Sequence, residues 1–137
     1  MRLPISSGCE LNGTDRLEAL FDTNIIIDYL NGIPESRAEL ARYRRVFISP
    51  ITFVEVLVGT SQASDVTVRA FLARFTMAEL STATLEAAIR LRKEYRIRVP
   101  DALVWAAAEV HGLLIVTRNT RDFPAEHPSV RVPYTLP

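Results

Sequence analysis

The chain has 137 residues, of which 48% are apolar and 23% charged, as expected for one globular domain with a single core. Its 16 basic and 16 acidic side chains balance, so recognition of nucleic acid through a global positive field is excluded. Cys9 is the only cysteine, which excludes a disulfide framework and a thiolate zinc site. We find neither an apolar signal segment nor the ~20 apolar residues of a membrane span, and expect a cytoplasmic protein without membrane contact.

Short strands alternate with helices along the predicted chain. Residues 1–16 have no hydrophobic period and are predicted to form an N-terminal tail or extension, followed by one domain over 17–137. We predict strands at about 17–21, 46–49, 77–80, 113–116 and 130–132, and helices at about 24–30, 50–59, 66–75, 83–95 and 101–111, with a helical tendency over 35–45. The alternation predicts an α/β fold with a central, mainly parallel sheet of four to five strands and helices on both faces.

Three acidic residues occupy comparable places in these elements. Asp22 follows the first strand, Glu55 stands early in the helix after the second strand, and Asp101 begins the helix before the fourth strand. Strand ends and the helix starts that follow them lie on one edge of a parallel sheet, so the carboxylates of Asp22 and Glu55 can converge there. Converging carboxylates repel each other unless a cation lies between them, and Mg²⁺ with oxygen ligands is the natural occupant.

Each acid, taken alone, also has a purely structural interpretation. Asp22 could cap the helix that follows it. Glu55 stands three residues after Thr52 and would complete a capping box if Thr52 were the N-cap. Asp101 in a first helical turn is favoured by the helix dipole. The three acids together are more specific than any one of them.

Four segments together resemble the signature segments of a known family. They are Phe-Asp-Thr-Asn at 21–24, Ile-Thr-Phe-Val-Glu-Val-Leu-Val-Gly at 51–59, Pro-Asp-Ala-Leu-Val-Trp-Ala-Ala-Ala at 100–108 and Ile-Val-Thr-Arg-Asn-Thr-Arg-Asp-Phe at 115–123. In this order and spacing they are similar to PIN-domain ribonucleases over about residues 18–135. They most resemble the VapC toxins of bacterial toxin–antitoxin pairs.

The resemblance implies a PIN-like three-layer fold and a Mg²⁺- or Mn²⁺-dependent endonuclease that cuts single-stranded or loop RNA. It also implies a homodimer and a VapB-like antitoxin as partner. The acids of the family's site fall on Asp22, Glu55 and Asp101, which would hold the cation that activates a water. The supporting partners that we predict are Thr23, Asn24 and Thr117.

The fourth segment departs from the family pattern. Many members carry an acid two residues after the threonine, where this chain has Asn119, although an acid follows at Asp122. We expect Asn119 to face the acidic site as a neutral oxygen ligand and Asp122 to face its rim. Either residue could complete the metal site.

Candidates for contact with the RNA backbone are the arginines near the third and fourth segments, Arg96, Arg98, Arg118 and Arg121. For Arg96 and Arg98 a solvated helix end is an equal alternative. Asp28, one helical turn after Asn24, could support the site or simply be solvated.

Two other functions compete with the ribonuclease. A PIN-like module could bind RNA or protein without cutting it. A phosphatase of the haloacid dehalogenase type would need a second acid two residues after Asp22, and that position is Asn24.

Overall fold

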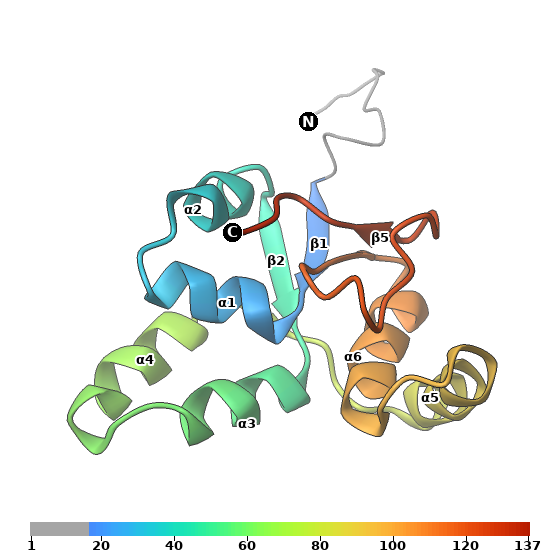
Figure 1. The fold of residues 1–137 in the computed structure, drawn as a ribbon. Helices are drawn as coiled ribbons and strands as arrows, with labels where there is room; N and C mark the ends of the chain where they lie inside the picture. Colours follow the sequence, from blue (N-terminus) through green and yellow to red (C-terminus); the bar gives the residue numbers. More distant parts are fainter. Residues whose placement is uncertain (1–16) are drawn as a thin grey trace.

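A five-stranded parallel sheet forms the centre of the fold (Figure 1). The structure, a computed structural model, describes residues 17–137, so the predicted tail over 1–16 lies outside the described residues. The strands are β1 (Glu18–Phe21), β2 (Arg45–Ile48), β3 (Thr76–Met77), β4 (Leu114–Val116) and β5 (Val130–Arg131), in the spatial order β3-β2-β1-β4-β5. Every neighbouring pair is parallel, which confirms the predicted α/β class.

The helices are α1 (Thr23–Leu30), α2 (Pro34–Leu40), α3 (Pro50–Val58), α4 (Asp65–Leu72), α5 (Thr82–Tyr95) and α6 (Val99–Val110), with a 3-10 turn η1 (Gln62–Ser64) before α4. The helical tendency predicted over 35–45 is confirmed only in its first part, because α2 ends at Leu40 and β2 begins at Arg45. The third strand is shorter and earlier than the predicted 77–80, since only Thr76 and Met77 pair with β2. No helix within residues 17–137 is long and apolar enough to cross a membrane.

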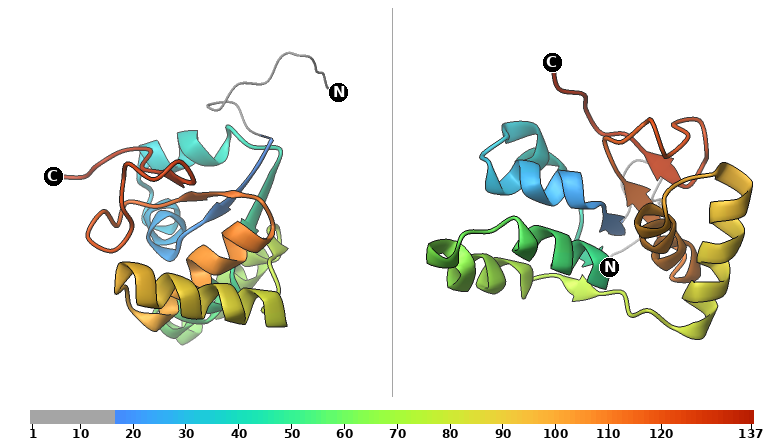
Figure 2. Two further views of the ribbon diagram at one scale, coloured as in Figure 1. Left: turned by 90° about the vertical axis from the view of Figure 1, so that its right-hand side faces the viewer. Right: turned by 60° about the horizontal axis from the view of Figure 1, so that its bottom comes forward.

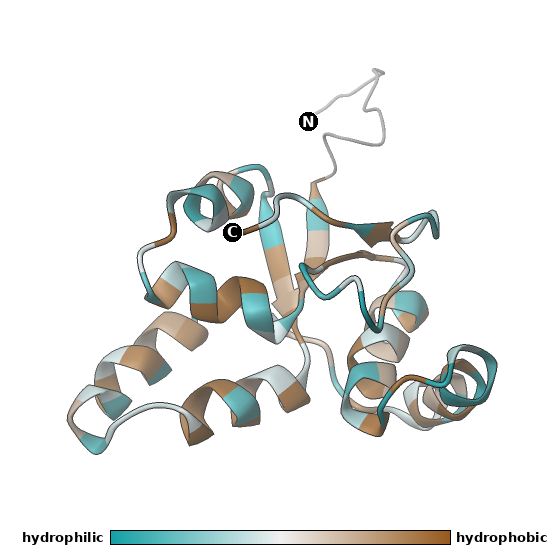
Figure 3. Ribbon diagram, in the orientation of Figure 1, coloured by the Kyte–Doolittle hydropathy of each residue, from teal (hydrophilic) through white to brown (hydrophobic). Residues whose placement is uncertain are grey.

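Alternate residues of each strand face opposite layers, as the twofold period of a strand requires. Leu20, Phe47 and Ile115 pack with α5 and α6, whereas Phe21 and Ile48 pack with α1, α3 and α4. Figure 2 shows the two groups of helices on opposite sides of the sheet. Apolar residues are concentrated in the strands, while the helices alternate between apolar and polar residues (Figure 3). The sheet is therefore the middle layer of three.

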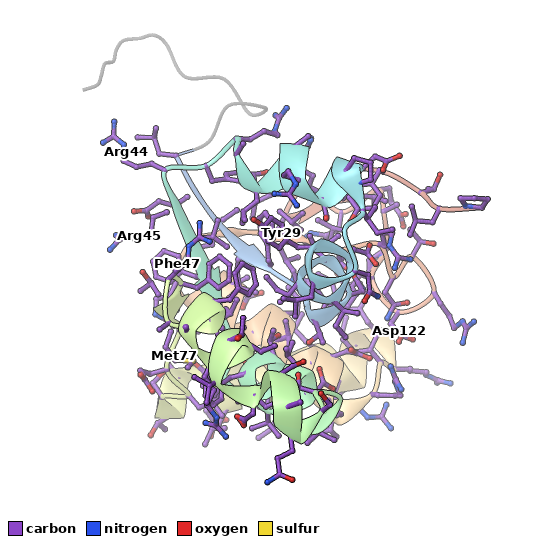
Figure 4. The ribbon with its side chains drawn as sticks, turned by 90° about the vertical axis from the view of Figure 1, so that its left-hand side faces the viewer. Tyr29, Arg44, Arg45, Phe47, Met77 and Asp122 are labelled. Atoms are coloured by element: carbon purple, nitrogen blue, oxygen red, sulfur yellow. The ribbon has the colours of Figure 1, made fainter. Side chains whose placement is uncertain are left out.

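The order of the strands determines where a ligand site can form. The chain runs outward from β1 through β2 to β3 and then crosses to β4 on the other side of β1. The carboxyl ends of β1 and β4 thus flank the point where the direction of winding reverses, which is where open α/β sheets bind ligands. Arg44 and Arg45, at the start of β2, lie on the opposite side of the molecule from Asp122 (Figure 4).

Candidate metal centre

Asp22 lies at the carboxyl end of the central strand and is 4% exposed. It is the N-cap of α1, and its Oδ1 accepts a hydrogen bond from the Thr23 backbone N–H at 2.8 Å. Its Oδ2 accepts bonds from Asn24 Nδ2 at 3.1 Å and from Thr117 Oγ1 at 2.8 Å. The capping interpretation of Asp22 is thus correct. The three predicted supporting residues, Thr23, Asn24 and Thr117, each donate a hydrogen bond to its carboxylate.

The carboxyl group of Asp22 is costly to ionise. Burial raises its pKa above the usual range, and the charge of Glu55 raises it further, although hydrogen bonds from Thr117, Thr23 and Asn24 act in the opposite direction. A positive charge beside Asp22 would relieve this cost.

Glu55 approaches the site through Thr23. Thr23 Oγ1 lies 2.6 Å from Glu55 Oε1, to which it donates, and 2.9 Å from Thr52 Oγ1. The capping-box alternative is wrong, because α3 is capped by Ser49, whose Oγ accepts from the backbone N–H of Ile51. Thr52 instead lies within α3, where its side chain is fully buried and contacts the hydroxyl of Thr23. Sequence reasoning missed this role of Thr52.

Asp101 and Asp122 form a carboxyl pair. Asp101, in the first turn of α6, is 9% exposed, and its side chain is hydrogen-bonded to that of Asp122. Burial, this bond and the charge of Asp22 raise the pKa of Asp101 to about 6. Arg98 lies against both acids, with Nε 3.1 Å from Asp101 Oδ2 and Nη2 3.5 Å from Asp122 Oδ2.

The fourth segment forms a tight turn after β4. Asn119 lines the acidic cavity as expected, whereas Asp122 is not part of the cavity lining and lies beside Asp101 and the largely exposed Arg98. In this turn Asn119 Oδ1 accepts from the Asp122 N–H at 3.3 Å and Asn119 O accepts from the Phe123 N–H at 3.1 Å. Asn119 Nδ2 also donates to Asp122 Oδ2 at 2.9 Å, and this bond lowers the pKa of Asp122.

Three acids, Asp22, Glu55 and Asp101, line one cavity of about 460 Å³. Its lining residues are Asp22, Thr23, Asn24, Ile27, Val54, Glu55, Val58, Arg98, Asp101 and Asn119. A second cavity of about 530 Å³ shares Asn24 and Asn119 with the first and is otherwise lined by Arg118, Thr120 and Arg121. An acidic hollow and a basic one therefore adjoin each other.

The side chains that line the acidic cavity can be tested as ligands for a divalent metal ion. Within residues 17–137, no three His, Cys, Asp or Glu side chains are close enough to hold one ion between them. The donors that face the acidic cavity are nevertheless all carboxylate, amide and hydroxyl oxygens, which suit Mg²⁺ or Mn²⁺. Burial is the largest cause of the raised pKa values of Asp22 and Asp101, so a cation at the cavity would favour the ionised form of both groups. The donor set fits a hard divalent cation.

Two of the four candidate arginines, Arg98 and Arg118, form ion pairs with acids of the protein. Arg118 Nε and Nη2 bind Asp28 Oδ2 and Oδ1 at 2.7 and 2.9 Å, and Tyr134 OH donates to Asp28 at 2.7 Å. Asp28 is 5% exposed, so it is not solvated, and it supports the loop after β4. Arg96 ends α5 in a left-handed conformation with φ 57°. Arg121 is exposed at the second cavity, and RNA contact by any of these residues stays a prediction.

Comparison with known proteins agrees with this arrangement. The family model of the PIN domain matches residues 19–125, and the chain belongs to the PIN domain family. Among solved structures, a toxin–antitoxin complex from Klebsiella pneumoniae is 39% identical, covering 86% of this chain and 99% of that one, with a TM-score of 0.82. The DNA-bound VapBC of Salmonella typhimurium is 26% identical over 84% of this chain and 96% of that one, with a TM-score of 0.69.

A third structure, FitAcB from Neisseria gonorrhoeae, is 22% identical over 86% of this chain and 99% of that one, with a TM-score of 0.69, and supports the fold alone. A search of curated proteins found no match. The predicted resemblance to VapC-type PIN domains is confirmed.

Proposed function

We propose that this PIN domain is a metal-dependent endoribonuclease that acts as the toxin of a toxin–antitoxin pair. The observation that supports it most strongly is the convergence of Asp22, Glu55 and Asp101 on one cavity at the carboxyl ends of β1 and β4. Asp122 adds a fourth acid through its bond to Asp101. Acids that line one cavity in this way favour a bound cation more than they favour stability.

Mg²⁺ or Mn²⁺ held by Asp22, Glu55 and Asp101, with Asn119 or Asp122, would lower the pKa of a water and offset charge on the phosphate. The surrounding residues fix these acids in place. Thr117 and Asn24 orient the Asp22 carboxylate, and Thr23 orients Glu55. Ile27, Val54 and Val58 form an apolar rim of the cavity and are exposed in the free protein.

The adjoining basic cavity suits the substrate. Arg121 is exposed there and can reach a phosphate beside the one that is cut. Arg118 is a weaker candidate for the RNA backbone, because both oxygens of Asp28 hold it in the free protein. Arg98 has only an exposed ion pair with Asp101, and Arg96 is exposed at the end of α5.

A VapB-like antitoxin and a second copy of the chain are the proposed protein partners. The solved structures similar to this chain include toxin–antitoxin complexes. Exposed apolar side chains on α1, α3 and α4 offer a surface for a partner; they are Ile27, Leu30, Val54, Val58 and Val66. Ile27, Val54 and Val58 also line the acidic cavity, so a partner on this surface would obstruct the site.

The two competing functions are less well supported. A PIN-like module that binds without cutting would not need four acids at one edge. A haloacid dehalogenase-type phosphatase would need a second acid at position 24. This chain has Asn24 there, whose amide donates to Asp22.

The test is to incubate the purified protein with a pool of RNAs, with Mg²⁺, Mn²⁺ or EDTA, and to map the new ends. We expect new ends with either metal and none with EDTA. Adding the product of the neighbouring reading frame should suppress cleavage. Absence of new ends with both metals, or cleavage that persists in EDTA, would contradict the proposal.

The contributions of Asn119 and Asp122 can be separated by calorimetric titration of Mn²⁺. Asp122→Asn should weaken binding by about 10–100-fold, because Asp122 contacts Asp101. Asn119→Asp should tighten it, since a carboxylate replaces a neutral oxygen at the cavity. The metal-free Asn119→Asp protein should be less stable, because the amide that donates to Asp122 is lost. Asp65→Asn, in α4 outside the cavity, is the control; equal affinities for all four proteins would contradict the assignment.

A further inference from the structure

Arg98 is the one basic residue among the described residues that line the acidic cavity. Its Nε and Nη2 both lie 3.1 Å from a single oxygen, Asp101 Oδ2, and Nη2 lies 3.5 Å from Asp122 Oδ2. The charge of Glu55 also acts on it. The guanidinium therefore provides the positive charge that the carboxyl pair would otherwise lack.

Comparison with Arg118 indicates how firmly Arg98 is held. Arg118 binds both oxygens of Asp28, at 2.7 and 2.9 Å, and its side chain is 28% exposed. Arg98 binds one oxygen of Asp101 at longer distances, and its side chain is 75% exposed. It is the N-cap of α6 but makes no capping hydrogen bond with its side chain. An exposed ion pair of this kind is weak, so another cation can displace Arg98 at little cost.

We propose that Arg98 is an exchangeable counterion, bound to Asp101 and Asp122 in the metal-free protein and released to the RNA phosphate when a divalent cation binds. This inference rests on the proposed ribonuclease function. A divalent cation bound to Asp101 would neutralise the carboxylate charge that holds Arg98 and would repel the guanidinium, so binding of the cation favours release of Arg98. The freed side chain remains at the mouth of the cavity, and a guanidinium pairs with phosphate in the geometry that it uses with carboxylate.

The first half of the exchange is tested by the metal affinity alone. Arg98→Ala should tighten Mn²⁺ binding, measured by calorimetry without RNA, by about two- to fivefold, which is the worth of an exposed ion pair. The matched control is Arg121→Ala, which removes another positive charge that acts on Asp122 but lines the neighbouring cavity. A gain no larger than that of the control would overturn the proposal.

The second half is tested on RNA at saturating Mn²⁺. Arg98→Ala should lower kcat/KM, although its metal site is filled more easily, and the slope of log(kcat/KM) against log[salt] should become shallower by about 1. Arg98→Lys keeps the charge and should keep the slope. An unchanged slope in Arg98→Ala would overturn the exchange. If the wild-type protein cuts no RNA at all, the proposed function fails, while the calorimetric comparison still tests whether Arg98 competes with the cation.

Discussion

Asp101→Asn should abolish RNA cleavage while the protein stays folded. Asp101 contacts Asp122, faces the charge of Asp22 and lines the cavity, so its carboxylate is central to the proposed cation site. Loss of a direct ligand should reduce the cleavage rate by more than the ~10–100-fold of an outer-shell change. Asp22→Asn and Glu55→Gln should be similarly inactive. The measurement is the rate of appearance of mapped RNA ends in Mn²⁺, with Asp65→Asn as the control.

The same substitution makes a prediction about stability. Because the pKa of Asp101 is raised from 3.8 to about 6 in the folded protein, its contribution to stability is present at low pH and lost as the pH rises through about 6. In EDTA, the free energy of unfolding of the wild type should therefore fall between pH 3.8 and 6 relative to that of Asp101→Asn. Urea unfolding curves across this range measure the difference. Full cleavage by Asp101→Asn in metal, or a variant that does not fold, would contradict the assignment.

The positions of Asp22 and Glu55 could be predicted because they depend on local patterns, whereas Asp101 depends on the tertiary fold. An apolar run that ends in Asp-Thr-Asn predicts a strand and a capped helix, and both are present around Asp22. The parallel order of the strands then brings Asp22 and Glu55 to one edge without further information. Asp101 joins them because α6 starts at this edge before the chain returns through β4.

The turn after β4 could not be predicted in the same way. Whether Asp122 faces the rim or the acids depends on side-chain bonds within Asn119–Asp122, and several turn types are compatible with this composition. A shift of one residue in such a loop changes which side chain enters the site.

Long-range ion pairs could not be predicted either, because no sequence periodicity connects residues that are so far apart in the chain. Arg118 and Asp28 are 90 residues apart, and Arg131 and Glu39 are 92 apart. In each case the acid is buried and a tyrosine completes the cluster, Tyr134 in the first and Tyr43 in the second. Both clusters attach the last part of the chain to the helices on one face of the sheet. Nothing in α2 alone indicated that Glu39 would be buried.

Glu39 therefore offers a second strong test, of stability instead of cleavage. Its carboxylate accepts from Arg131 Nε at 2.6 Å and Nη2 at 2.9 Å, and from Tyr43 OH at 2.8 Å. Glu39 is 4% exposed. Burial alone would raise its pKa, but the bonds from Arg131 and Tyr43 outweigh burial and leave the pKa below its usual value. Burial, together with the hydrogen bond to Glu39 and the charge of Glu39, raises the pKa of Tyr43 to about 12.

Glu39→Gln should lower the free energy of unfolding by ~3 kcal/mol at neutral pH, because Arg131 is left partly buried without its acid. The lowered pKa means that this stabilisation is present above the ordinary value of 4.5 and is lost as the pH falls through the folded-state pKa. The gap between wild type and variant in urea unfolding should therefore narrow in acid. Glu35→Gln, an exposed acid in the first turn of the same helix, should cost at most about 1 kcal/mol. Equal losses for the two variants would mean that the Glu39 cluster contributes no more than an ordinary surface charge.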